Sequence, residues 1–195
     1  MRRFKNSIPA LFTLVLMAGL VLNFGGCTQD NPLAPRNSEI SGKVAQSNIG
    51  TIHMLEVDAK LQSLFKGEVF YAEEFIKADD GGTVKIGNRE VGRSKIKIDE
   101  DALPQDMTIS LRAVGGLMSH LEFGPHGTIF NKPVKVELSY KGAALTGIDE
   151  DNLQIFYFNQ DTGVYEAIES EVDKEHKKVT AYLNHFSRYA VAWSG

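Results

Sequence analysis

The sequence is poor in the residues on which several common kinds of site depend. It has one cysteine, Cys27, among 195 residues, which excludes an internal disulfide, an iron–sulfur cluster and any metal site built from several cysteines. Its 21 Lys and Arg residues are outnumbered by 25 Asp and Glu residues, and the net charge of −4 excludes a broad nucleic-acid-binding footprint. It also lacks a G-x-S-x-G elbow, a P-loop, a dinucleotide-binding fingerprint and an H-E-x-x-H motif. We therefore expect no nucleic-acid partner, no cofactor and no common hydrolase site.

The N-terminal segment has the organisation of a secretory signal peptide. A basic start over residues 1–5 is followed by an apolar stretch over residues 8–22 and by the small residues Gly25 and Gly26. As a helix, the apolar stretch would span about 22 Å, short of the ~30 Å hydrocarbon core of a bilayer, which disfavours a permanent transmembrane helix. We therefore expect residues 1–26 to be a removable signal peptide.

The end of this segment resembles the lipobox of bacterial lipoproteins. Gly25 and Gly26 directly precede the sole cysteine, although Phe24 stands where Leu is usual. The resemblance implies cleavage before Cys27 and diacylglycerol on its sulfur, so that the membrane is a partner through the lipid. Several acyl chains on one residue anchor a protein stably. By analogy, Thr28 in place of Asp favours the outer membrane of a two-membrane cell; the alternative is an ordinary secreted protein cut nearby.

The remaining chain divides into three parts. Removal of residues 1–26 takes away three basic residues, which leaves 18 basic and 25 acidic residues and a net charge of −7. Residues 27–47 are polar, contain two prolines and a glycine, and are predicted to be a flexible tether. Residues 48–77 are ambiguous between a short helix and strands, and residues 78–195 are predicted to form one domain. The helical alternative depends on the spacing of three apolar residues: Leu61, Leu64 and Phe65.

The domain alternates between apolar and polar residues with a period of two. Such alternation places apolar side chains on one face and is typical of antiparallel strands with one buried face. Asp79-Asp80-Gly81-Gly82 is a turn signal between two of these strands. The expected strands cover residues 74–78, 83–86, 95–98, 107–113, 134–140, 153–158, 164–168 and 179–183. Many short strands with regularly spaced turns predict an all-β fold, a mostly antiparallel β-sandwich.

Seven segments of the domain follow one another in a recognisable order: Gly81-Gly82-Thr83-Val84, Ile96-Lys97-Ile98, residues 121–130, Lys132-Pro133-Val134, residues 153–157, Gly163-Val164-Tyr165 and residues 185–191. This order resembles the ZU-five domain, a β-sandwich found in ankyrins, netrin receptors and many bacterial surface proteins. Tyr165 departs from the pattern, since relatives often have Trp there. The resemblance implies a protein-interaction or structural module over about residues 78–193, with another envelope or extracellular protein as its partner and no enzymatic activity.

The tripeptide His185-Phe186-Ser187 is a candidate self-processing site. In some ZU-five relatives this tripeptide is cut between Phe and Ser. The Ser187 hydroxyl would attack the Phe186 carbonyl carbon, His185 would accept the hydroxyl proton, and water would hydrolyse the resulting ester. On an unbroken strand, His185 and Ser187 share the core-facing side with Cα atoms roughly 6.5 Å apart. We favour the alternative, in which these buried polar side chains bond each other or nearby backbone and hold the last strand in place.

A second candidate site is the segment from His120 to His126. His120 and Glu122 would share a strand face, and the turn at Gly124-Pro125 could bring His126 back toward them. Two imidazoles and a carboxylate are possible metal ligands, and the same loop could recognise a glycan. Both are alternatives to the expected absence of a metal.

The sequence thus predicts a membrane-anchored lipoprotein of the bacterial cell envelope with a non-catalytic β-sandwich. Self-cleavage between Phe186 and Ser187 is the alternative from the enzyme class. Glycan or metal binding around His120 to His126 is the alternative from the ligand-binding class.

Overall fold

The computed structural model describes residues 51–62 and 69–195, whose regular secondary structure is almost entirely β. The helical elements within these two ranges are α1 (Ala59–Gln62) and a single 3-10 turn, η1 (Glu150–Asn152). In these two ranges, no helix is long and apolar enough to cross a bilayer. The predicted signal peptide, lipobox and tether fall outside the described residues.

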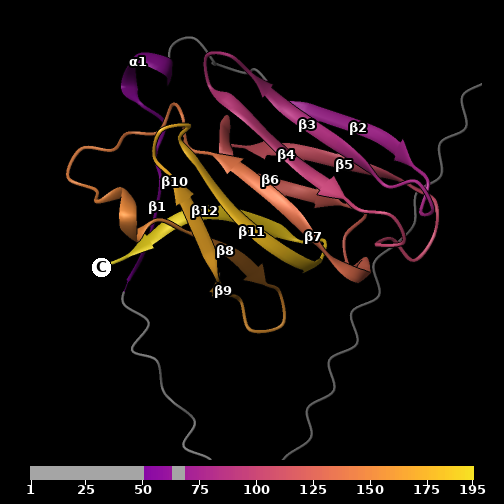
Figure 1. The fold of residues 1–195 in the computed structure, drawn as a ribbon. Coiled ribbons are helices and arrows are strands. Elements are labelled where there is room, and N and C mark those ends of the chain that lie inside the picture. The colour runs from indigo at the N-terminus through magenta and orange to yellow at the C-terminus, as the bar shows by residue number, and fades with distance from the viewer. Residues whose placement is uncertain (1–50, 63–68) are drawn as a thin grey trace, which may run out of the picture. The chain divides into compact units, whose positions relative to one another are not determined.

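The larger sheet has seven strands in the order β2-β5-β6-β12-β8-β9, with β1 paired to β12 as the seventh. All of its pairings are antiparallel. Its strands are β1 (Ile52–Met54), β2 (Tyr71–Ile76), β5 (Met107–Val114), β6 (Leu117–Gly124), β8 (Gln154–Asn159), β9 (Val164–Ile168) and β12 (Arg188–Ser194) (Figure 1).

The smaller sheet has five antiparallel strands in the order β10-β11-β7-β4-β3. Its strands are β3 (Gly82–Asn88), β4 (Gly92–Ile98), β7 (Ile129–Ser139), β10 (Ser170–Asp173) and β11 (Lys178–His185). The two sheets pack against each other and confirm the predicted all-β sandwich.

The core lies between the sheets and is filled by the apolar residues of the alternating strands. On β7, for example, Val134, Val136 and Leu138 are each at most 1% exposed, whereas the intervening Lys135 and Glu137 reach the outer face. Burial of this apolar surface is the main force that holds the layers together.

One buried polar bridge crosses between the sheets. The Ser94 hydroxyl on β4 donates to the Met118 carbonyl on β6 at 2.6 Å and accepts from the Ser139 N–H on β7 at 2.8 Å. Ser94 is fully buried, so this hydroxyl satisfies two backbone groups that water cannot reach. Nearby, the equally buried Ser119 hydroxyl has no hydrogen-bond partner within the described part of the chain.

Several short connections carry the chain from one sheet to the other. The turn at Asp79-Asp80-Gly81-Gly82 joins β2 of the larger sheet to β3 of the smaller sheet, and the β11–β12 connection leads back. Gly81 is the residue that the first connection requires, because its φ is +65° and a Cβ there would lie 2.5 Å from the Ile98 carbonyl oxygen.

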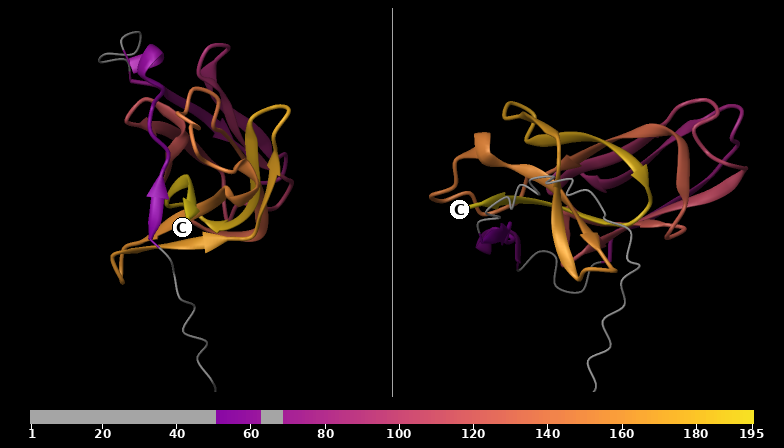
Figure 2. Two further views of the ribbon diagram at one scale, coloured as in Figure 1. Left: turned by 90° about the vertical axis from the view of Figure 1, so that its left-hand side faces the viewer. Right: turned by 90° about the horizontal axis from the view of Figure 1, so that it is seen from below.

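The ambiguous segment 48–77 contributes both helix and strand. β1 pairs with β12, α1 contains Leu61, and β2 pairs with β5. Figure 2 shows β1 beside the yellow C-terminal strand. The larger sheet therefore extends N-terminal of residue 78.

Candidate functional site

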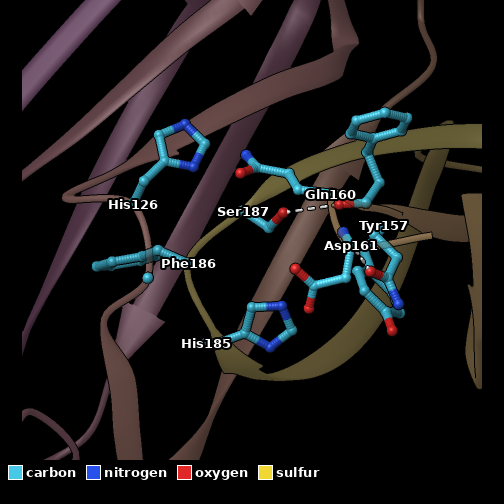
Figure 3. Close-up of a pocket in the computed structure, with 10 residues that line it drawn as sticks. His126, Tyr157, Gln160, Asp161, His185, Phe186 and Ser187 are labelled. Atoms are coloured by element: carbon cyan, nitrogen blue, oxygen red, sulfur yellow. Dashed lines mark hydrogen bonds between the residues drawn. The ribbon is translucent and has the colours of Figure 1, made fainter. Parts of the chain in front are cut away.

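A pocket of about 340 Å³ lies where three connections of the sandwich meet. These are the β6–β7 turn, the β8–β9 turn and the β11–β12 connection. Its walls combine aromatic rings with imidazole, amide, carboxylate and hydroxyl groups, a mixture typical of binding sites. The labelled residues in Figure 3 are His126, Tyr157, Gln160, Asp161, His185, Phe186 and Ser187.

The tripeptide His185-Phe186-Ser187 forms the β11–β12 connection. β11 ends at His185 in the smaller sheet and β12 begins at Arg188 in the larger sheet. The expectation of one unbroken strand, with His185 and Ser187 on the same core-facing side, is therefore wrong. Period-two alternation holds only while a chain stays in one sheet, and here consecutive residues, Phe186 and Ser187, are both buried.

Backbone hydrogen bonds tie this connection to the β6–β7 region. The Phe186 N–H donates to the Thr128 carbonyl at 2.9 Å, and its carbonyl accepts from the Gly127 N–H at 3.2 Å. The Ser187 carbonyl accepts from the Phe123 N–H at 3.1 Å. Although the chain changes sheets here, most backbone N–H and C=O groups of the tripeptide therefore have a hydrogen-bond partner, as buried backbone groups require.

The Phe186 side chain anchors the connection in the core. It is 1% exposed and meets the Phe130 ring edge-to-face at a centroid distance of 4.7 Å. It also lies nearly parallel to Phe123 at 6.2 Å. Such ring pairs add to the stabilisation that burial itself provides.

Ser187 and His185 have separate partners. The Ser187 hydroxyl donates to the Phe158 carbonyl on β8 at 3.2 Å, toward which it points in Figure 3. The His185 ring stands edge-to-face on Tyr157 at 5.4 Å, and the His185 carbonyl accepts from the Tyr189 hydroxyl at 2.6 Å. Within the described residues, no hydrogen bond joins His185 to Ser187, so the base–nucleophile contact of an activated serine is not formed.

The β8–β9 turn forms the opposite wall of the pocket. The Asn159 side-chain oxygen accepts from the Asp161 N–H at 3.0 Å, while its amide nitrogen donates to Glu166 at 2.6 Å. The Tyr157 hydroxyl donates to the same carboxylate, and this bond together with that of Asn159 lowers the pKa of Glu166. Asn159 and Glu166 could not be identified from the sequence, because neither belongs to a recognisable motif.

The three candidate metal ligands are not brought together. His126 lines the pocket, whereas His120 lines a separate hollow beside Met54 and Tyr165. Burial lowers the pKa of His120, whose Nε2 atom is enclosed without a hydrogen-bond partner in the described chain. Residues 51–62 and 69–195 contain no group of three His, Cys, Asp or Glu side chains placed to hold a metal ion.

Two arginines form ion pairs with Glu122 on the outer face of the larger sheet. Arg188 donates to it through Nε at 2.9 Å and through a terminal nitrogen, and Arg112 donates from the other neighbouring strand. Burial acts to raise the pKa of Glu122, but the bonds from the two arginines outweigh it and hold the pKa below its ordinary value. A carboxylate held in this way stabilises the sheet instead of ligating a metal.

This arrangement predicts a pH-dependent contribution of Glu122 to stability. We expect Glu122→Gln to lower the free energy of unfolding at neutral pH by about 1 kcal/mol, a modest loss because both arginines are about half exposed. Since the folded-state pKa is depressed, the contribution is present above the ordinary value of 4.5 and disappears as the pH falls through the folded value. Urea unfolding of both proteins across this range measures the difference, and a constant difference down to acid pH would contradict the assignment.

The sequence-predicted site is thus divided among different places in the fold. His126 and the tripeptide 185–187 meet at the pocket, His120 and Glu122 do not, and Cys27 falls outside the described residues. Comparison of the chain with protein-family models gives no match, and comparison with curated proteins gives none either.

Proposed function

We propose that this chain is a lipid-anchored protein of the bacterial cell envelope whose β-sandwich is a non-catalytic interaction or structural module. The signal-like residues 1–26 and the position of Cys27 support the anchor, and the order of segments that resembles the ZU-five domain supports the module. The partner is another envelope or extracellular protein.

The hydrogen bond from Ser187 to Phe158 is the main support for a module without catalytic activity. A hydroxyl that donates to a backbone carbonyl at 3.2 Å is a structural hydrogen bond, here between the β11–β12 connection and β8. The hydroxyl must leave this bond and gain a base before it can attack the Phe186 carbonyl carbon. The ground-state geometry therefore supports a structural role for the tripeptide.

The pocket supplies the contact surface of the proposed module. It is built from connections at one end of the sandwich, where rigid strands position exposed loop residues such as His126 and Asp161. Aromatic walls and several hydrogen-bonding groups suit a small polar side chain or ligand group of the partner.

Self-cleavage is the second candidate, and one contact favours it. The Gly127 N–H donates to the Phe186 carbonyl at 3.2 Å, where it would also stabilise the negative charge that forms on this oxygen during attack. Self-cleavage requires both such a donor and a hydrogen bond between the serine and a base. The described residues provide the donor but no hydrogen bond from Ser187 to His185.

Intact-mass measurement of the chain purified from bacterial membranes tests the proposal. We expect a single species that begins at Cys27, carries added acyl mass, and is unbroken between Phe186 and Ser187. In a Cys27→Ser variant the acyl mass is expected to disappear.

Two results would contradict different parts of the proposal. A wild-type chain without acyl mass would refute the lipid anchor. A fragment that starts at Ser187, and that is absent from a Ser187→Ala variant, would replace the structural role of the tripeptide by self-cleavage.

A further inference from the structure

The outer face of the smaller sheet carries more basic than acidic side chains, although the chain as a whole is acidic. Alternation along β3, β4, β7 and β11 places six cationic side chains on this face, and the only carboxylate that these four strands add to it is that of Glu137. We call this surface the basic face. Its cations are Lys85, Arg93, Lys95, Lys97, Lys135 and Lys178.

Strand register sets lysines directly opposite one another on the basic face. Lys85 on β3 is paired with Lys95 on β4, and Lys97 on β4 is paired with Lys135 on β7. Like charges in directly opposed positions destabilise a sheet. The two lysine pairs therefore destabilise the folded sheet, so the stability of the fold does not explain their presence.

The available acidic partners compensate only part of this charge. Glu137 lies 3.0 Å from both Lys95 and Lys178 and 3.9 Å from Lys135, so three lysines share one carboxylate. Lys97 bonds Asp99 at the end of β4 at 2.7 Å.

The uncompensated part of the face lies over β3 and β4. Lys85 and Arg93 are exposed and have no acidic group within 4 Å in the described part of the chain. The acidic residues Glu171 and Asp173 lie at the far edge, on β10.

We propose that the basic face docks on the anionic phospholipid headgroups of a membrane. Its cations lie on one side of a β-sheet, so several phosphates of a bilayer surface can meet them at once, and each basic residue near such a surface strengthens attachment. Tyr182, opposite Lys135 and 61% exposed, adds a ring of the kind that is enriched at the membrane–water interface.

The proposed anchor makes this membrane the nearest anionic surface. This step rests on the proposed function, in which Cys27 carries lipid and the polar segment 28–47 is a tether. A coil of about 20 residues has a root-mean-square span of roughly 25 Å, so an anchored domain stays close to the headgroups. A basic surface and a lipid are the two signals whose combination gives stable attachment.

Vesicle sedimentation with full-length chain made without lipid tests the docking independently of the anchor. We expect binding to phosphatidylcholine vesicles to increase when phosphatidylglycerol is included, and the increase to vanish in high salt. The apolar residues 8–22 bind both kinds of vesicle, and the basic residues 1–5 add a preference for anionic lipid. The measured quantity is therefore the change that a substitution on the basic face causes in the difference between the two kinds of vesicle.

The variant Lys85→Gln/Lys135→Gln removes one member of each like-charge pair. We expect it to lose about fivefold in phosphatidylglycerol-dependent binding for each lysine, and to unfold at or above the wild-type temperature because repulsion is relieved. The matched control Lys77→Gln/Lys174→Gln has the same net charge but alters lysines outside the basic face, and it should bind within about twofold of wild type.

Three results would overturn the proposal. These are no preference of the wild type for anionic vesicles, an equal loss in the control variant, and binding to polyphosphate in solution without any vesicle preference. Absence of acyl mass on Cys27 in cells would refute the anchor alone, since the vesicle experiment uses the unlipidated chain.

Discussion

Phe186→Ala is expected to lower the free energy of unfolding by about 3–5 kcal/mol, the range typical of removing a buried aromatic ring. The ring is 1% exposed and contacts Phe130 and Phe123, so its removal leaves a cavity at the point where the chain changes sheets. Urea unfolding monitored by circular dichroism measures the loss. We expect the pocket wall to loosen as well, because the neighbouring residues His185 and Ser187 line it.

Phe75→Ala is the matched control for this prediction. Phe75 lies on β2 and is 60% exposed, so the same substitution should change the free energy of unfolding by less than about 0.5 kcal/mol. Equal losses in the two variants would show that the tripeptide is not the anchor described above.

Ser94→Ala is expected to cost about 2–4 kcal/mol, because it leaves two buried backbone groups without a partner. The Met118 carbonyl and the Ser139 N–H both bond the Ser94 hydroxyl and belong to strands of opposite sheets. The same urea experiment measures the effect.

Ser119→Ala provides a control with the identical chemical change. The Ser119 hydroxyl is also fully buried but has no partner among the described residues, so its removal should be neutral or stabilising. A loss at Ser119 as large as that at Ser94 would refute the inter-sheet bridge as the cause.

The sequence predicts individual strands well because each strand shows its own alternation. Residues 107–113 fall in β5 and residues 134–139 in β7, and the apolar side chains expected to face the core are buried in β7 and more buried than their neighbours in β5. The sheet that a strand joins depends on contacts far away in the sequence, which a local pattern does not contain. The glycine-rich turn after Ala78 therefore resembles a hairpin but joins two sheets, and the four-residue β10 was not expected.

The candidate site could be predicted only in part for the same reason. The sequence marks the tripeptide 185–187, but the bonds that hold it come from Thr128 and Gly127, on a turn more than fifty residues earlier. The net charge is uninformative about the basic face for a similar reason. A value of −4 averages over all faces, whereas strand register decides that lysines from β3, β4 and β7 become neighbours.

The pairing of β1 with β12 decides how the domain responds to mechanical load. With the proposed lipid anchor, a force that pulls the domain from the membrane enters at Thr51, where it acts first on the hydrogen bond from the Gly195 N–H and then on the pair Ile52–Ser194. Antiparallel strands loaded from this end separate like a zipper, one residue pair after another, and β1 has only three such pairs. We therefore expect β1 to peel away at low force and to lengthen the tether, while the remainder of the sandwich stays folded.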